Sequence, residues 1–118
     1  MAVVPAAFTL LTQRQLESDS NSRQLVGADA GSPVSLILVE MPPGGRVRLH
    51  RHAYAEVFVV HEGRATYRVG DDRVEVWAGQ VVVVPAGTPH GFENTGDVPL
   101  RQTDIHCSDQ IVTEWLEA

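Results

Sequence analysis

Short apolar runs separated by turn residues dominate the chain from Val34 onward. They recur at roughly eight- to twelve-residue spacing, which is typical of an all-β sandwich or barrel. Gly, Pro and Asp stand between the runs, where tight turns need them. The predicted strands cover residues 34–41, 46–50, 56–61, 65–69, 74–77, 81–84, 90–94 and 100–106. The run 81–84 is four consecutive valines, which predicts a strand buried on both faces.

The two ends of the chain have a different pattern. Residues 13–31 are mostly polar and include a serine-rich stretch. We therefore expect residues 1–33 to form a partly ordered arm that adds a short edge strand near 24–26. Apolar residues recur at helical spacing between Ile111 and Leu116, and Asp109 is a suitable cap. The pattern predicts a barrel over residues 34–107 and a short C-terminal helix within residues 108–118.

Length and charge narrow the class of protein. A chain of 118 residues is one domain, and its net charge of −6 disfavours nucleic acid or an anionic membrane as a partner. It lacks both a basic signal-peptide start and the roughly 20 apolar residues that a membrane helix needs. We therefore expect a cytoplasmic protein with a small-molecule ligand or substrate.

Four residues have the chemistry and spacing of a metal site. His50 and His52 are two apart at a strand end, so their imidazoles point to the same side and can converge on one ion. Glu56 opens the next predicted strand, and its carboxylate can close a third position. His90 begins a later strand and would reach the same ion if that strand were an antiparallel neighbour.

These residues lie in two longer patterns that resemble the cupin motifs. Gly44-x5-His50-x-His52-x3-Glu56-x6-Gly63 is similar to the first motif at every position. Gly79-x5-Pro85-x-Gly87-x2-His90-x3-Asn94 is similar to the second. The resemblance implies a double-stranded β-helix, a jelly-roll-like barrel. It also implies a metal held by His50, His52, Glu56 and His90, and a homodimer, since members often dimerise.

The metal is predicted only as a class. Three imidazoles and one carboxylate suit several divalent transition metals, so availability in the cell decides among them. We favour iron or manganese, with nickel and zinc next, and cobalt and copper also fit the donor set.

Strand alternation predicts which side chains surround the ion. Phe58 shares a face with Glu56, and Phe92 shares one with His90, so both rings are expected to line a pocket or to pack in the core. Arg48 has the parity of His50 and would pair with an anionic substrate group or lie in solvent, unless a bulge shifts the parity.

The last predicted strand and the turn between the ligands add further candidates. If the polar face of strand 100–106 points inward, Gln102 and His106 would contact the ligands or a substrate. We expect His106 not to bind the metal, because the set of four is already complete. Tyr54 is expected at the entrance of the site.

Several functions are compatible with these residues. We expect a small-molecule metalloenzyme of the dioxygenase type, with isomerisation, epimerisation or polyketide-type cyclisation as other reactions. A non-catalytic cupin that binds or senses a small molecule is the main alternative, and a purely structural metal is a third. The motifs hold no obvious general base, and fold resemblance does not identify the reaction.

Overall fold

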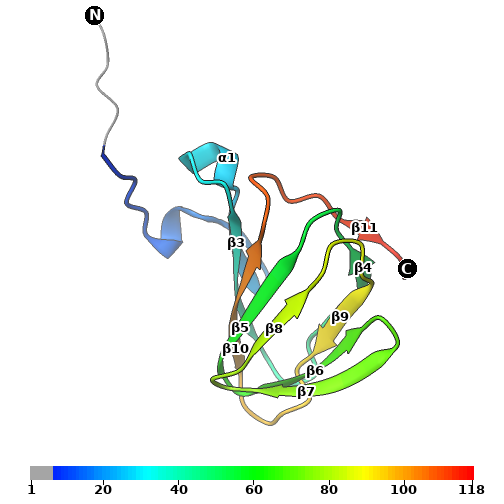
Figure 1. Cartoon of the computed structure of the whole chain (residues 1–118). Coiled ribbons are helices and arrows are strands. Elements are labelled where there is room, and N and C mark those ends of the chain that lie inside the picture. Colours follow the sequence, from blue (N-terminus) through cyan, green and yellow to red (C-terminus); the bar gives the residue numbers. More distant parts are fainter. Residues whose placement is uncertain (1–6) are drawn as a thin grey trace, which may run out of the picture.

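Two antiparallel β-sheets packed face to face form the body of the protein (Figure 1). The structure, a computed structural model, describes residues 7–118. Its helical turns are η1 (Gln13–Gln15) and α1 (Gly27–Ala30). Its strands are β1 (Glu17–Asp19), β2 (Ser22–Leu25), β3 (Ser35–Met41), β4 (Arg46–Arg51), β5 (Glu56–Glu62), β6 (Arg64–Val69), β7 (Asp72–Trp77), β8 (Val81–Val84), β9 (His90–Glu93), β10 (Leu100–His106) and β11 (Glu114–Trp115).

The strand order is that of a double-stranded β-helix. One sheet has the order β1-β2-β3-β10-β5-β8 and the other β11-β4-β9-β6-β7. From β3 to β10 the chain therefore crosses repeatedly between the sheets, and both sheets contribute inward side chains to one interior. The predicted all-β fold is confirmed. Among residues 7–118, no helix has the length and apolar character required to cross a membrane.

The segment expected to form an arm extends the first sheet. β2 pairs with β3, and β1 pairs with β2, so residues 17–25 form a hairpin at one edge of that sheet. The opposite edge is β8, and here the sequence-based expectation is wrong. Val81 and Val83 are 56% and 63% exposed, whereas Val84 is buried. A strand at the edge of an antiparallel sandwich buries only its inward face, so four valines in a row do not imply two covered faces.

The predicted C-terminal helix is also wrong. Residues 107–113 form bends and irregular chain, and β11 then pairs antiparallel with β4, placing Trp115 opposite His50 (Figure 1). An isolated helix of this length is marginal, whereas the edge of β4 offers free backbone groups. Leu116 uses one of them by donating its N–H to the carbonyl of Leu49 at 3.0 Å.

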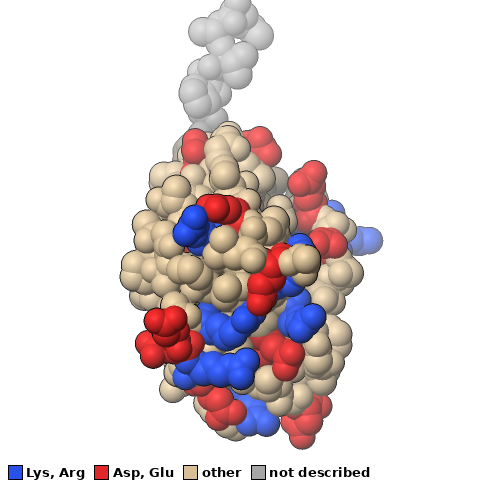
Figure 2. All heavy atoms as spheres, turned by 90° about the vertical axis from the view of Figure 1, so that its right-hand side faces the viewer, with Lys and Arg blue, Asp and Glu red and all other residues tan. Residues whose placement is uncertain are grey.

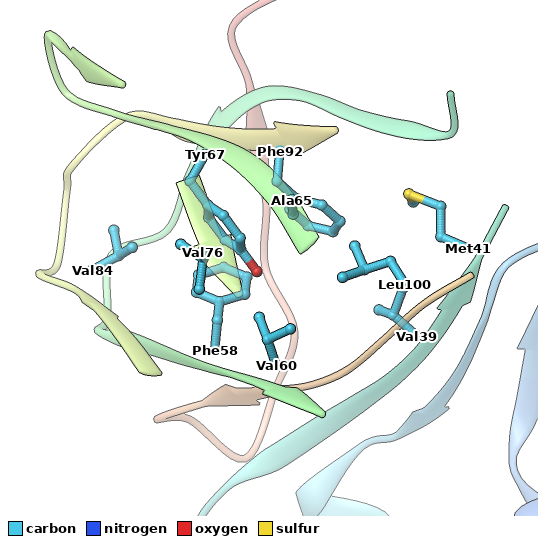
Figure 3. Close-up of a cluster of buried hydrophobic side chains, with 10 residues drawn as sticks. All are labelled: Val39, Met41, Phe58, Val60, Ala65, Tyr67, Val76, Val84, Phe92 and Leu100. Carbon is cyan, nitrogen blue, oxygen red and sulfur yellow. The ribbon is translucent and has the colours of Figure 1, made fainter. Parts of the chain in front are cut away.

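A cluster of buried apolar side chains fills one end of the interior (Figure 3). The ring of Tyr67 contacts two phenylalanines, 5.2 Å from Phe58 edge to face and 5.3 Å from Phe92 in a stacked arrangement. Such contacts add to the free energy gained by burial. The cluster consists of Val39, Met41, Phe58, Val60, Ala65, Tyr67, Val76, Val84, Phe92 and Leu100.

Candidate metal centre

The structure brings the four candidate ligands together. One donor atom from each of His50, His52, Glu56 and His90 lies within 4.8 Å of the others, and all four residues are buried. His50 on β4 pairs directly with His90 on β9, so the two sequence motifs meet through this pairing. His52 follows the end of β4, and Glu56 opens β5 on the opposite sheet.

Each of the three histidines is held by a backbone carbonyl. Nδ1 of every ring donates a hydrogen bond to a main-chain oxygen, so the neutral ring leaves its Nε2 lone pair free. Ligand histidines in metalloproteins are oriented in the same way. The bonds run from His50 to Arg48 (2.7 Å), from His52 to Val112 (2.8 Å) and from His90 to Thr88 (2.9 Å).

The donor atoms fit a cation. Oε1 of Glu56 lies 3.0 Å from Nε2 of His52 and 3.1 Å from Nε2 of His90. With both rings neutral these are lone pairs facing a carboxylate oxygen, and they need a proton or a cation between them. Among residues 7–118, Nε2 of His52 has no aligned hydrogen-bond partner. Three imidazole nitrogens and one carboxylate are a donor set for a divalent transition metal.

The pKa values of His50 and Glu56 favour the same assignment. Burial lowers the pKa of His50 to about 4, so its lone pair is available at neutral pH. Burial alone would also lower the pKa of His52, but Glu56 and the bond to Val112 outweigh it and raise that pKa. Burial would raise the pKa of Glu56, yet its contacts with His106, His52 and His90 hold the pKa far below its usual value. The carboxylate is therefore ionised.

The four residues border a cavity of about 390 Å³, a volume suited to a small molecule. Phe58 and Phe92 point into the interior as strand alternation predicted, and both belong to the cavity wall as well as to the core. The ring of Phe58 lies 5.7 Å from that of His90. Further apolar wall is supplied by Ile37, Val39, Met41, Val47, Ile111 and Trp115.

A bulge in β4 keeps Arg48 out of the inward row. Val47 pairs with Phe92 and His50 with His90, so one extra residue lies between the two pairs and the alternation is interrupted. Gly91 permits the close approach, because a Cβ there would lie 2.8 Å from the carbonyl oxygen of Val47. The guanidinium of Arg48, at the cavity rim, lies 4.6 Å from the Trp115 ring centre.

The polar face of β10 points inward, and it holds a residue that sequence reasoning did not single out. Gln102 accepts a hydrogen bond from the hydroxyl of Tyr67 at 2.7 Å and donates one to Asp104 at 2.7 Å. Asp104 is buried in the cavity wall, where burial and then the charge of Glu56 raise its pKa well above the ordinary value. The sequence signal for Asp104 was its place between Gln102 and His106 on the same face of the predicted strand.

His106 and Tyr54 lie on the far side of the glutamate. Nε2 of His106 is 3.1 Å from Oε2 of Glu56, whereas His52 and His90 face Oε1. The hydroxyl of Tyr54 lies 2.8 Å from Nδ1 of His106. The Tyr54 ring stacks on His52 at 4.9 Å.

The C-terminal tail covers the end of the barrel that holds the four candidate ligands, here called the metal end. The Trp115 ring lies 5.0 Å from that of His50, and Thr113 also borders the cavity. Ion pairs hold the tail to the second sheet, where Figure 2 shows basic and acidic side chains intermingled. These pairs are Arg51 with Glu114 at 2.8 Å and Arg68 with Glu117 at 2.7 Å. The prediction of a C-terminal helix did not reveal that the tail covers the site.

Comparison with known proteins agrees with the geometry. A family model described as a cupin domain matches residues 37–106. The uncharacterized protein MJ1618 of Methanocaldococcus jannaschii is 35% identical over 86% of this chain and 83% of its own length. The polyketide synthase CurC of Streptomyces cyaneus is 36% identical over 70% of this chain and 52% of its own.

Solved structures show the same fold. Oxalate decarboxylase from Bacillus subtilis superposes with a TM-score of 0.82 at 15% identity, covering 96% of this chain. The present chain spans only about a third of that enzyme, 33% of its length. An uncharacterized double-stranded β-helix protein from Klebsiella pneumoniae gives a TM-score of 0.73 at 16% identity, over 92% of this chain and 97% of its own. From its two motifs, its fold and these matches, the chain belongs to the cupin domain family.

Proposed function

We propose that this protein is a metalloenzyme that binds a small oxygen-containing molecule at a divalent metal and acts as a dioxygenase. The observation that carries the proposal is the convergence of three free Nε2 lone pairs and Glu56 at the wall of a cavity of about 390 Å³. When bound, such a metal supplies Lewis acidity or activates O2. Iron or manganese is favoured, and the oxalate decarboxylase of Bacillus subtilis, a structural neighbour, has Mn(II) centres.

The chain's own residues would bind and shield the substrate. Phe58 and Phe92 offer an apolar wall beside the ligands, which would exclude water from the reacting atoms. Arg48 stands at the rim, where its guanidinium can meet an anionic group before the substrate reaches the ion. The substrate is therefore expected to combine a chelating oxygen pair with an apolar body.

Asp104 favours a second candidate, a proton-transfer reaction such as isomerisation, cyclisation or decarboxylation. It is a buried carboxyl in the same cavity, and its raised pKa keeps it protonated to a higher pH than an exposed aspartate, so it is suited to donate a proton. Relatives support this breadth, since one is the polyketide synthase CurC and another is the oxalate decarboxylase OxdC.

Metal analysis followed by turnover assays tests the proposal. Protein purified without added metal is analysed for its elements, stripped, and reloaded with Fe(II) or Mn(II) separately. Oxygen uptake is then followed with diketones, catechols and thiols, and parallel anaerobic reactions with keto acids and oxalate are followed by NMR. Metal-dependent oxygen uptake supports the dioxygenase, and anaerobic turnover that disappears in D104N supports the second candidate.

The controls separate binding from catalysis. The H50A/H52A double variant should lose the metal, whereas H61A should keep it, because His61 is exposed and its Nε2 lies 2.9 Å from the hydroxyl oxygen of Thr103, outside the candidate site. An unchanged metal content in H50A/H52A would contradict the assigned site. A compound that raises the melting temperature of the loaded protein without turnover would indicate a binding or sensing cupin instead.

A further inference from the structure

Four buried histidines surround the metal centre, and one of them is bonded differently from the rest. His50, His52 and His90 each give the Nδ1 hydrogen to a backbone carbonyl, which can only accept it. Nδ1 of His106 instead faces the hydroxyl of Tyr54 at 2.8 Å. A hydroxyl can donate or accept, so the direction of this bond depends on the other partner of Tyr54.

That partner is the backbone of the C-terminal tail. The N–H of Val112 donates to the Tyr54 hydroxyl oxygen at 3.2 Å. The hydroxyl keeps its own hydrogen to donate, and among residues 7–118 Nδ1 of His106 is the acceptor within hydrogen-bond distance. With Nδ1 accepting, a neutral His106 carries its hydrogen on Nε2, the reverse of the three candidate ligands.

The Nε2 hydrogen of His106 lies beside Oε2 of Glu56, the carboxylate oxygen that does not face His52 and His90. His106 is 2% exposed, and its Nε2 lies 3.1 Å from Oε2 of Glu56, within hydrogen-bond distance. The N–H is not aligned with that oxygen in this structure, and Nε2 has no aligned partner elsewhere in residues 7–118. A small rotation of the carboxylate completes the bond at Oε2 and leaves Oε1 facing His52 and His90.

We propose that Tyr54 and the backbone of Val112 hold His106 as an Nε2–H donor that positions Glu56, so that one carboxylate oxygen faces the metal. The inference rests on the proposed metal site and adds two positioning residues to it. It also gives the tail a second task. The carbonyl of Val112 accepts the Nδ1 hydrogen of His52, which leaves the Nε2 lone pair of His52 available to the ion. The N–H of Val112 orients the hydroxyl of Tyr54, so that Nε2 of His106 carries a hydrogen and cannot bind the ion.

The proton positions can be read in the metal-free protein. Long-range ¹H–¹⁵N NMR of labelled protein at about pH 8 reports which nitrogen of each histidine carries a hydrogen. We expect Nδ1–H for His50, His52 and His90, and Nε2–H for His106. An Nδ1–H signal for His106 in the unmodified chain would overturn the proposal, whatever the metal results are.

Two variants remove the two links separately. Y54F deletes the hydroxyl, and V112P deletes the N–H that orients it, while V112A keeps that N–H as the matched control. We expect His106 to shift to a mixture of both forms in Y54F and V112P and to stay Nε2–H in V112A. An unchanged His106 in Y54F overturns the proposal even if V112P fails to fold.

Metal affinity is the second readout, with Mn(II) as the probe in calorimetric titrations. Y54F and H106L should bind Mn(II) about 10- to 100-fold more weakly, as losses of groups that orient ligands usually do. H106Q should recover most of the affinity, because its amide N–H can still donate to Glu56. Equal Mn(II) affinity in wild type, Y54F and H106L would overturn the positioning role. If the wild type binds no metal, the proposed function fails, and the NMR result is judged by itself.

Discussion

The two ends of the barrel interior are built by the same strands but hold opposite kinds of side chain. Along its inward face, each of three strands changes from polar residues at the metal end to apolar residues at the other. Both ends are buried to a similar degree. The changes run from Glu56 to Phe58 and Val60 on β5, from His90 to Phe92 on β9, and from His106, Asp104 and Gln102 to Leu100 on β10.

The difference shows where stability and function are located in this fold. At the apolar end, burial itself favours folding, at about 25 cal/mol for each Å² of apolar surface. At the metal end, burial is unfavourable unless each polar group finds a partner, and Nε2 of His52 and of His106 lack an aligned one within residues 7–118. The apolar end should therefore hold the barrel together, whereas the polar end should gain stability when it binds an ion.

Truncating the apolar end should have the largest effect on stability. Leu100 has 0% exposure and does not border the metal cavity. L100A should lower the free energy of unfolding by about 2–5 kcal/mol, because it removes buried methyl groups and leaves a cavity. Denaturant titration measures this, with V98A as the control, since Val98 is 49% exposed. A loss in L100A no larger than in V98A would remove the apolar end as the main source of stability.

Adding metal should stabilise the opposite end by a comparable but smaller amount. At a free metal concentration of one hundred times Kd, the folded state should gain about 2.7 kcal/mol, provided that the unfolded chain does not bind. The melting temperature of the stripped protein should rise with Mn(II) and fall again with a chelator. The melting temperature of E56Q should not rise with Mn(II). That of L100A should start lower and rise as much as that of the unmodified protein. An equal rise in E56Q would mean that the ion binds elsewhere.

Sequence patterns predicted which four residues cluster as candidate ligands because those positions depend on local rules. His50 and His52 share a side by strand alternation, and glycines at the motif positions make the turns that separate the strands. At Gly87, for example, φ is +79°, which favours glycine, and its N–H bonds the carbonyl of His52 at 2.7 Å. Such features are encoded within a few residues of the ligand itself.

The features that the sequence left open, missed or mispredicted depend on neighbours that are distant in the sequence. The bulge before His50 follows from how β4 approaches Gly91, and the exposure of Val83 follows from the place of β8 at a sheet edge. The tail is extended because β4 offers a free edge next to it. A helical spacing of apolar residues cannot reveal that edge. For the same reason Asp104 was overlooked, since its importance comes from Glu56 on the neighbouring strand β5, which is far away in the sequence.

Replacing Asp104 should stabilise the metal-free protein by an intermediate amount. The folded-state pKa of this acid lies above its unfolded value, so folding favours the protonated form and stability falls as the pH rises past the unfolded pKa. The asparagine in D104N cannot ionise, and its side-chain oxygen can still accept the hydrogen bond from Gln102. The free energy of unfolding of D104N should therefore be higher by about 1–3 kcal/mol at pH 7 and little changed at low pH. Unfolding free energies from pH 4 to 8 test this, with exposed D97N as the control. A D104N that is less stable at neutral pH would contradict the prediction.

The smallest expected effect concerns the tail that crosses the metal end. Glu117 accepts hydrogen bonds from Arg68 and from the N–H of Leu49, and these lower its pKa to about 2. Because the folded-state pKa is depressed, the stabilisation is present above the unfolded value and is lost as the pH falls towards 2. E117Q should therefore loosen the tail at neutral pH without unfolding the barrel. The Leu116 amide, bonded to Leu49, should lose exchange protection, while amides of β10 keep theirs.

Hydrogen exchange read by NMR, expressed as protection relative to the free peptide, measures this local opening. E62Q is the matched control, since Glu62 forms an exposed pair with Arg101 on the other sheet at 3.5 Å. If E117Q left Leu116 as protected as E62Q does, the tail would be held by β-pairing and Trp115 alone. If E117Q lowered the exchange protection of amides throughout β10, the two ends of the interior would not open independently. Loosening the tail over the polar end would then also open the apolar end.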